Sequence, residues 1–270
     1  MLLCLVGSEM CIRDRYEKVC KFSSYLKKLN LQKGDRVAAY VPNKIETIIC
    51  FLACAKNGII WSSCSPDFGA QGVVDRFKQI EPKVFITCDY YYYNGKKINI
   101  LDKVEKILKQ IPSIKKVIAF NYNKQERESL KNFINFEETL KNDLDEVFER
   151  FEFNHPIYIL FSSGTTGKPK CITHGSGNVL IEHNKEFMLH CDIRENEKLF
   201  YYTTTGWMMW NWLVGGLATG SSIFLFDGAP VYPKADVLLE YCQNKKINLF
   251  GVSAKYIDHL KNEKYNSKNL

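Results

Sequence analysis

The feature that most constrains the fold of this chain is a regular alternation between short apolar segments and longer segments with helical periodicity. The apolar segments, which we interpret as strands, cover residues 36–41, 59–61, 83–87 and 116–120. The segments with apolar residues at helical spacing cover residues 16–30, 44–56, 70–80 and 100–110. Strands that are apolar throughout must be covered on both faces, and helices that cross over between parallel strands provide that cover. We therefore predict an α/β fold in which parallel sheets are flanked by helices on both faces.

A second block of the same kind begins near Pro156. It contains expected strands at 158–161, 199–202, 222–226 and 248–251 and expected helices at 178–190, 235–244 and 254–262. The stretch 121–154 that precedes it is rich in Lys, Glu and Asn, which is typical of a solvated excursion between two blocks. We expect a first α/β subdomain at residues 16–154 and a second at residues 155–270.

Residues 1–15 (MLLCLVGSEMCIRDR) fit no motif of either block. Their apolar start has no basic region before it and no convincing small-residue cleavage site after it, so a signal peptide is a minor alternative. We expect it to be a non-native leader.

Composition excludes several classes of protein. The hydrophobic content of 46% suits a chain with a packed core, and the net charge of +7 is spread along the chain, which gives no support for nucleic-acid binding. No apolar stretch approaches the roughly 20 residues that a membrane span requires. The ten cysteines include no CxxC pair and the five histidines form no cluster at ligand spacing, so we expect a cytoplasmic protein that holds no metal through its own side chains.

The segment SSGTTGKPK, directly after the expected strand 158–161, combines flexible backbone, hydroxyls and positive charge. Such a loop at the carboxyl end of a strand suits a polyphosphate, because glycines let backbone N–H groups face an anion. It is not a Walker loop, since only two residues separate its glycines, and the alternative is a surface turn. The candidate ATP phosphate ligands are Ser162, Ser163, Gly164, Thr165, Thr166, Gly167, Lys168 and Lys170.

Residues 157–174 (IYILFSSGTTGKPKCITH) resemble the phosphate-binding signature of the adenylate-forming superfamily, which contains acyl-CoA synthetases, luciferases and nonribosomal peptide adenylation domains. The resemblance extends from Tyr16 to the end of the chain and implies the large N-terminal domain of such enzymes. Cys171 stands where most of the superfamily has glycine, and we expect it to pack. His174 is either an ordinary loop residue or a neighbour of the nucleotide.

The stretch 201–212 (YYTTTGWMMWNW) is most similar to the acetoacetyl-CoA synthetase branch of the superfamily. The expected acyl pocket comprises Gly206, Trp207, Met208 and Asn211. Trp207 would close the pocket so that only a short acid fits, and Asn211 would bond a keto oxygen. The alternatives are that at least one of the tryptophans at 207, 210 and 212 is a core residue, and that Asn211 caps a helix.

The resemblance also implies the reaction. The carboxylate of the acid attacks the α-phosphate of ATP to give an acyl-adenylate and pyrophosphate, with Mg²⁺ bridging the phosphates. The CoA thiolate then displaces AMP from the acyl-adenylate. Lys96 and Lys97 follow Gly95 where related short-chain synthetases place basic residues against the CoA 3′-phosphate; the alternative is a solvated pair. The expected partners are therefore ATP, acetoacetate or another short acid, and CoA.

By the same resemblance, the magnesium- and adenine-binding segment, the ribose-binding aspartate and the mobile C-terminal domain with the adenylation lysine lie beyond Leu270. We therefore expect an internal fragment of a longer acid–thiol ligase, with both subdomains incomplete and no activity alone. Two alternatives stay open, namely an acetyl- or propionyl-CoA synthetase fragment and a noncatalytic nucleotide-binding module.

Overall fold

The structure is a computed structural model that describes residues 2–4, 9–123, 132–162 and 167–265. Its larger sheet has seven strands in the order β10-β9-β3-β2-β4-β7-β8, all parallel except β10, which runs antiparallel to β9. The strands are β2 (Arg36–Tyr40), β3 (Ile60–Cys64), β4 (Val84–Cys88), β7 (Lys116–Phe120), β8 (Ile134–Asn135), β9 (Pro156–Ser162) and β10 (Lys170–Gly175). The α/β prediction is confirmed for this sheet.

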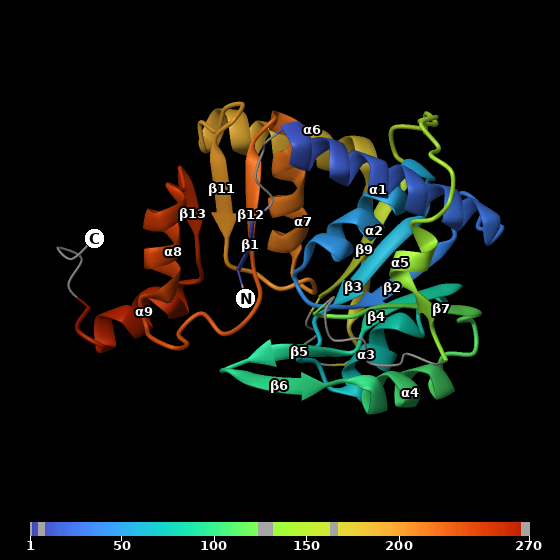
Figure 1. The fold of residues 1–270 in the computed structure, drawn as a ribbon, viewed down its shortest axis with the longest axis horizontal. Coiled ribbons are helices and arrows are strands. Elements are labelled where there is room, and N and C mark those ends of the chain that lie inside the picture. The colour runs from blue at the N-terminus through green and yellow to red at the C-terminus, as the bar shows by residue number, and fades with distance from the viewer. Residues whose placement is uncertain (1, 5–8, 124–131, 163–166, 266–270) are drawn as a thin grey trace.

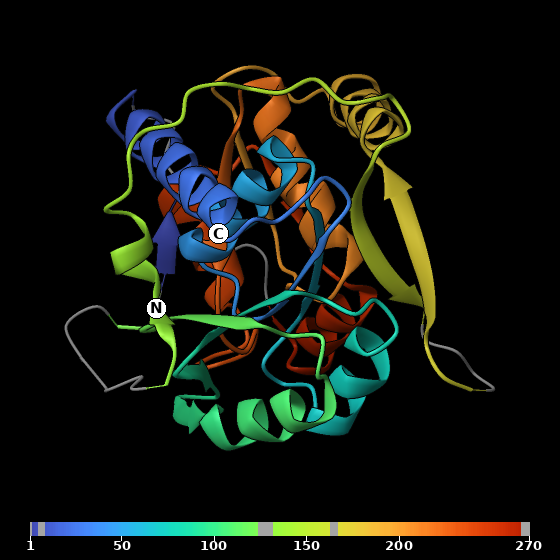
Figure 2. The same cartoon turned by 90° about the vertical axis from the view of Figure 1, so that its right-hand side faces the viewer.

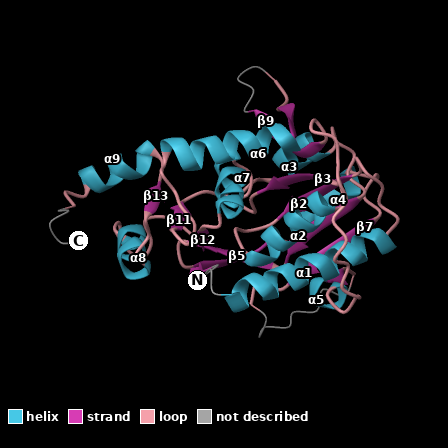
Figure 3. Ribbon diagram, turned by 90° about the horizontal axis from the view of Figure 1, so that it is seen from above, coloured by secondary structure: helices cyan, strands magenta, loops and turns pink. Residues whose placement is uncertain are grey.

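Helices cover the larger sheet on both faces. One layer contains α1 (Glu9–Lys28), α2 (Ile45–Lys56) and α5 (Phe136–Thr139), and the other contains α3 (Ala70–Phe77) and α4 (Leu101–Gln110), as Figures 1 and 3 show. In α4 the buried residues Val104 and Ile107 are three positions apart, so they share the face that packs inward. Helix α2 is mostly buried because it lies between α1 and the sheet.

A second sheet has the order β1-β12-β11-β13 and lies beside the first, with α7 (Met208–Gly215) between the two (Figure 1). Its strands are β1 (Leu2–Cys4), β11 (Lys198–Tyr201), β12 (Ser222–Phe226) and β13 (Leu249–Gly251). Because side chains alternate along a strand, Leu199 and Ile223 pack into the main core with α7. Phe200 and Phe224 face the other way, against α8 (Val237–Lys245) and α9 (Ala254–Asn262).

Trp210 anchors α7 against the larger sheet. It is fully buried, its ring stacks on Trp61 of β3 with centroids 6.4 Å apart, and its Nε1 donates to Asn43 Oδ1 at 2.9 Å. The prediction that at least one tryptophan of this stretch is a core residue is confirmed. Helix α7 is therefore fixed relative to the larger sheet.

The periodicity of the sequence did not reveal one hairpin, formed by β5 (Tyr90–Tyr93) and β6 (Lys96–Asn99). Its turn residues Asn94 and Gly95 have φ values of 48° and 73°, the conformation that tight hairpin turns require and that Asn-Gly adopts readily.

The polar stretch before the second block is anchored to the core. Lys56 Nζ, whose side chain is 1% exposed, donates to Asp145 Oδ2 at 3.1 Å and to the Val147 carbonyl at 2.6 Å. His155 Nε2 lies 2.8 Å from the Gly58 carbonyl. Together with β8 and α5, these contacts show that the expected solvated excursion is partly folded.

One predicted boundary divides the strands of the larger sheet, and the other falls inside a helix. β9 and β10 follow the expected division at residue 155 yet join the larger sheet, and the second sheet takes up the chain only from β11 onward, apart from β1. Helix α1 begins at Glu9, inside the expected leader. The leader and the two-subdomain division remain predictions.

Among the helices that the structure describes, none has the length and apolarity to cross a membrane.

Candidate active site

The glycine-rich segment connects β9 to β10 at the tip of a hairpin that projects from the sheet (Figure 2). Ser162 pairs with Lys170 at the base of the loop, and Ser162 is half-buried, whereas Gly167, Lys168 and Lys170 are exposed. The remaining candidate ligands, Ser163, Gly164, Thr165 and Thr166, lie outside the described residues. The loop leads into a strand rather than directly into a helix, because β10 pairs antiparallel with β9 before α6 (Ser176–Lys185) begins.

Gln79, just after α3, holds the C-terminal base of this loop. Its Nε2 donates to the Pro169 carbonyl at 2.8 Å and to the Asp75 carbonyl at 2.7 Å. Cys171 is exposed, and its Sγ lies 3.7 Å from Gln79 Oε1, so its contact with Gln79 is made at the surface and its packing role stays a prediction. Cys171 is exposed because it lies on the edge strand β10, which no further strand covers among the described residues.

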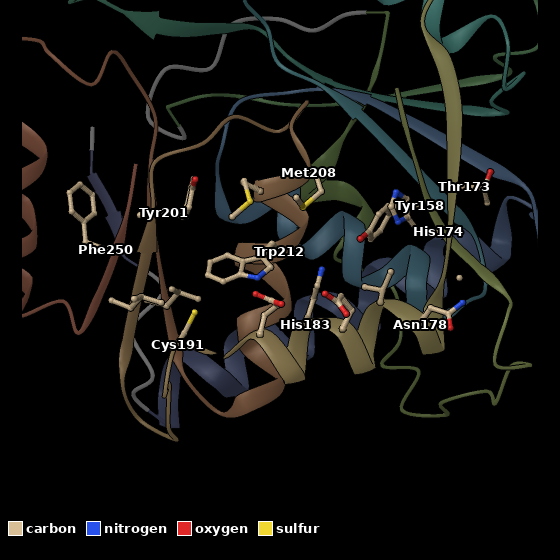
Figure 4. A pocket seen from close by; sticks show the side chains of 18 residues that line it. Tyr158, Thr173, His174, Asn178, His183, Cys191, Tyr201, Met208, Trp212 and Phe250 are labelled. Carbon is tan, nitrogen blue, oxygen red and sulfur yellow. The ribbon is translucent and has the colours of Figure 1, made fainter. Parts of the chain in front are cut away.

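A cleft of about 720 Å³ opens at the other end of the same hairpin. Its walls come from β10 and α6 on one side and from β11, β13 and α7 on the other (Figure 4). Most of the exposed lining is aromatic, aliphatic or thioether surface, including Tyr158, Val179, Tyr201, Met208, Met209 and Trp212. A cleft with this lining suits the apolar part of a small organic acid.

The structure places the four predicted acyl-pocket residues in different surroundings, and only one of them lines the large cleft. Met208 lines the cleft. Gly206 is needed where the chain turns past Phe68, since a Cβ at this position would lie 2.9 Å from the Phe68 ring. Trp207 is 66% exposed at the N-cap position of α7 and is not among the residues that line the cleft.

Asn211 is the fourth residue of α7, so its interpretation as a helix cap is wrong. It is 2% exposed, and neither its Oδ1 nor its Nδ2 has a hydrogen-bond partner among the described residues. It lines a second cavity of about 350 Å³ and not the large cleft.

Two histidines line the large cleft. The His174 ring lies 4.8 Å from the ring of Tyr158, and burial lowers the pKa of His174. His183 is 7% exposed, and burial likewise lowers its pKa. Burial therefore favours the neutral form of both imidazoles. Sequence reasoning did not single out His183; the helical spacing of Val179, His183 and Glu186 was the available signal.

Lys96 and Lys97 lie on β6, away from the lining of the large cleft, and both are exposed. Lys97 Nζ is 3.9 Å from the centroid of the Tyr90 ring, a cation–π contact.

A small polar cavity beside β5 is lined in part by Asp227, whose Oδ2 accepts a hydrogen bond from the Tyr122 hydroxyl at 2.8 Å. Burial raises the pKa of Asp227 to about 6.

No group of three or more His, Cys, Asp or Glu side chains that could hold a metal ion occurs in the part of the chain that the structure describes. The eight cysteines whose side chains are described are free thiols.

The fold and this site define a class of protein, an α/β domain with a glycine-rich loop at a strand end and an apolar cleft beside it. The chain belongs to the AMP-binding enzyme family, whose model matches residues 6–269. The resemblance to the adenylate-forming superfamily is confirmed.

Within this family, the chain is similar to several acetoacetyl-CoA synthetases. The chain is 47% identical over 246 residues to the acetoacetyl-coenzyme A synthetase of Rhizobium meliloti (strain 1021), covering 89% of this chain and 37% of that protein. It is 41% identical over 249 residues to the acetoacetyl-CoA synthetase of Danio rerio, covering 88% and 37%. The solved structure of the acetoacetyl-CoA synthetase from Streptomyces lividans matches with a TM-score of 0.89 and 38% identity over 93% of this chain and 39% of that one. The chain thus spans less than half the length of these relatives.

Proposed function

We propose that this chain forms the phosphate-binding and acid-binding part of an ATP-dependent acid–thiol ligase that converts acetoacetate to acetoacetyl-CoA through an acyl-adenylate. One observation carries the proposal: a single hairpin bears the glycine-rich loop at its tip and a wall of the apolar cleft at its base. The names of the relatives support acetoacetate as the acid.

The geometry of the hairpin fits the first chemical step. Four positions of β9 separate Tyr158 in the cleft wall from Ser162 at the loop, about 13 Å at the rise of an extended strand. The loop would bind the β- and γ-phosphates, and the acid would enter the cleft with its carboxylate toward the α-phosphate. Lys168 and Lys170 would offset the charge that develops on the departing pyrophosphate.

ATP, Mg²⁺ and CoA complete the proposed reaction. We place Mg²⁺ on the phosphates of ATP, as part of the substrate complex, and assign CoA to the surface near Lys96 and Lys97. These partners are small molecules, with no role for nucleic acid. A cytoplasmic location is consistent with the free thiols.

Titration calorimetry with MgATP tests the loop. Lys168→Ala is expected to weaken MgATP binding about tenfold, because it removes a charge-assisted phosphate contact from an exposed position. Lys78→Ala is the matched control, since Lys78 lines the same small surface cavity from the other side but lies outside the loop. Equal affinities for the chain and both variants would refute the loop assignment.

The choice of acid is tested in a chimera in which this chain replaces the matching segment of the Rhizobium meliloti relative. Acid-dependent pyrophosphate exchange is expected to be fastest with acetoacetate among acetoacetate, acetate, propionate and butyrate. A preference for acetate or propionate would assign the chain to that alternative, and no exchange despite a folded chimera would favour a noncatalytic binding module.

A further inference from the structure

We propose that the imidazole of His183 is the wall that limits the length of the acid accepted by the large cleft. This inference rests on the proposed function, because it assumes that the cleft binds the acid. It assigns the length limit to a residue of α6, whereas the sequence suggested Trp207.

Two cavities meet at His183. The large cleft of about 720 Å³ and the second cavity of about 350 Å³ share only the lining residues Tyr158, Val179 and His183. Val179 and His183 are four positions apart on α6 and therefore lie on the same face of that helix. These side chains form the partition between the cavities, and His183 provides its side toward α7.

The position of the imidazole is fixed by its neighbours. Its Nδ1 lies so close to Gly215 of α7 that a Cβ at residue 215 would overlap it. The ring also meets that of Phe187 edge to face, with centroids 6.4 Å apart. Figure 4 shows the His183 side chain extending from α6 toward α7. Gly215 therefore provides the space that lets an imidazole close the gap between the two helices.

The second cavity has the chemistry of an alkyl-chain site. Phe51 and Leu52 of α2 line it, together with Val214 of α7 and Leu217 in the short helical turn (Gly216–Thr219) that follows α7. Asn211 adds a buried amide, and Arg15 and Ser176 add polar side chains to a lining that is otherwise mainly apolar. An acid that is too long for the cleft would find apolar surface behind His183 if the imidazole were absent.

His183→Ala should join the two cavities. Each methylene that moves from water into apolar surroundings contributes about 0.8 kcal/mol, so two additional buried methylenes give roughly tenfold tighter binding. We expect His183→Ala to bind hexanoate about tenfold more tightly than the unmodified chain does. Butyrate is two methylenes shorter and, on this proposal, ends before the partition, so its affinity should change by less than about threefold.

Three variants accompany His183→Ala in the calorimetric titrations with acetoacetate, butyrate and hexanoate. His183→Phe keeps a ring at the partition and should show no gain for hexanoate. Leu180→Ala enlarges the second cavity, which Leu180 lines, without touching the partition, and should likewise show none. Trp207→Gly tests the wall that the sequence suggested, and its exposure of 66% predicts no gain.

The outcomes separate this inference from the proposed function. A hexanoate gain confined to His183→Ala supports the partition. If the chain binds acetoacetate but His183→Ala gains nothing for hexanoate, or if Trp207→Gly alone gains, the inference is wrong and the proposed function stands. If no acid binds to the folded chain, the acid-binding role of the cleft is wrong and the inference falls with it. Should His183→Ala fail to fold, His183→Ser is the replacement, with the same expected gain.

Discussion

Asn211 provides a sensitive test of the site, because two polar atoms of one buried side chain have no hydrogen-bond partner among the described residues. Burial of an unpaired amide costs about 1–3 kcal/mol in proteins. Leucine has a similar volume, carries no polar atoms and favours a helix interior by roughly half a kcal/mol over asparagine. We therefore expect Asn211→Leu to raise the free energy of unfolding by about 1–3 kcal/mol.

Asn43 is the matched control for this substitution. It is also buried, at 3% exposed, but its Oδ1 accepts from Trp210 Nε1 at 2.9 Å. Asn43→Leu leaves that indole N–H unpaired, so it should lower the free energy of unfolding by about 1–3 kcal/mol. The same Asn→Leu substitution is thus expected to raise the free energy of unfolding at residue 211 and to lower it at residue 43.

Urea unfolding, followed by circular dichroism, measures both changes as shifts of the midpoint at constant slope. If Asn211→Leu destabilises the chain as much as Asn43→Leu does, the Asn211 amide has a partner such as a bound water, and the reasoning is refuted. A stabilised Asn211→Leu variant would show that this amide is retained for a reason other than stability, which makes it a candidate for contact with a ligand.

Two further predictions concern ionised groups. Burial raises the pKa of Asp145, but hydrogen bonds from Lys27 and Lys56 outweigh it and bring that pKa down to about 2. Asp145→Ala should therefore lower the free energy of unfolding by about 3 kcal/mol, near the lower end for breaking a buried ion pair because the Asp145 side chain is 18% exposed. In the unmodified chain, the stabilisation from this ion pair should disappear as the pH falls from about 4 to about 2. Urea midpoints that stay constant across that pH range would contradict this prediction. Burial raises the pKa of Asp227 to about 6, above its unfolded value near 4, so stability should fall by up to about 3 kcal/mol as pH rises from 4 to 6. Asp227→Asn keeps an acceptor for the Tyr122 hydroxyl and should remove this dependence, whereas an unchanged midpoint profile between pH 4 and 7 would contradict the assignment.

The sequence by itself determined most of the regular elements. The expected strands at 116–120 and 222–226 match β7 and β12, and the expected helix at 254–262 matches α9. These segments were predictable because periodicity reports which face of a local element is buried, and that face is encoded within a few consecutive residues. The glycine-rich loop was recognisable for the same reason, since its order of residues is local.

The structure alone decided how elements distant in sequence meet. Strand β10 is exposed along most of its length and carries no apolar strand pattern, so its conformation depends on pairing with β9. The unpaired state of Asn211 depends on what surrounds α7. The role proposed for His183 depends on Gly215, 32 positions away, which leaves room for its ring. Periodicity along one segment holds no information about which polar side chain another segment will bury, so these features of the site required the tertiary structure.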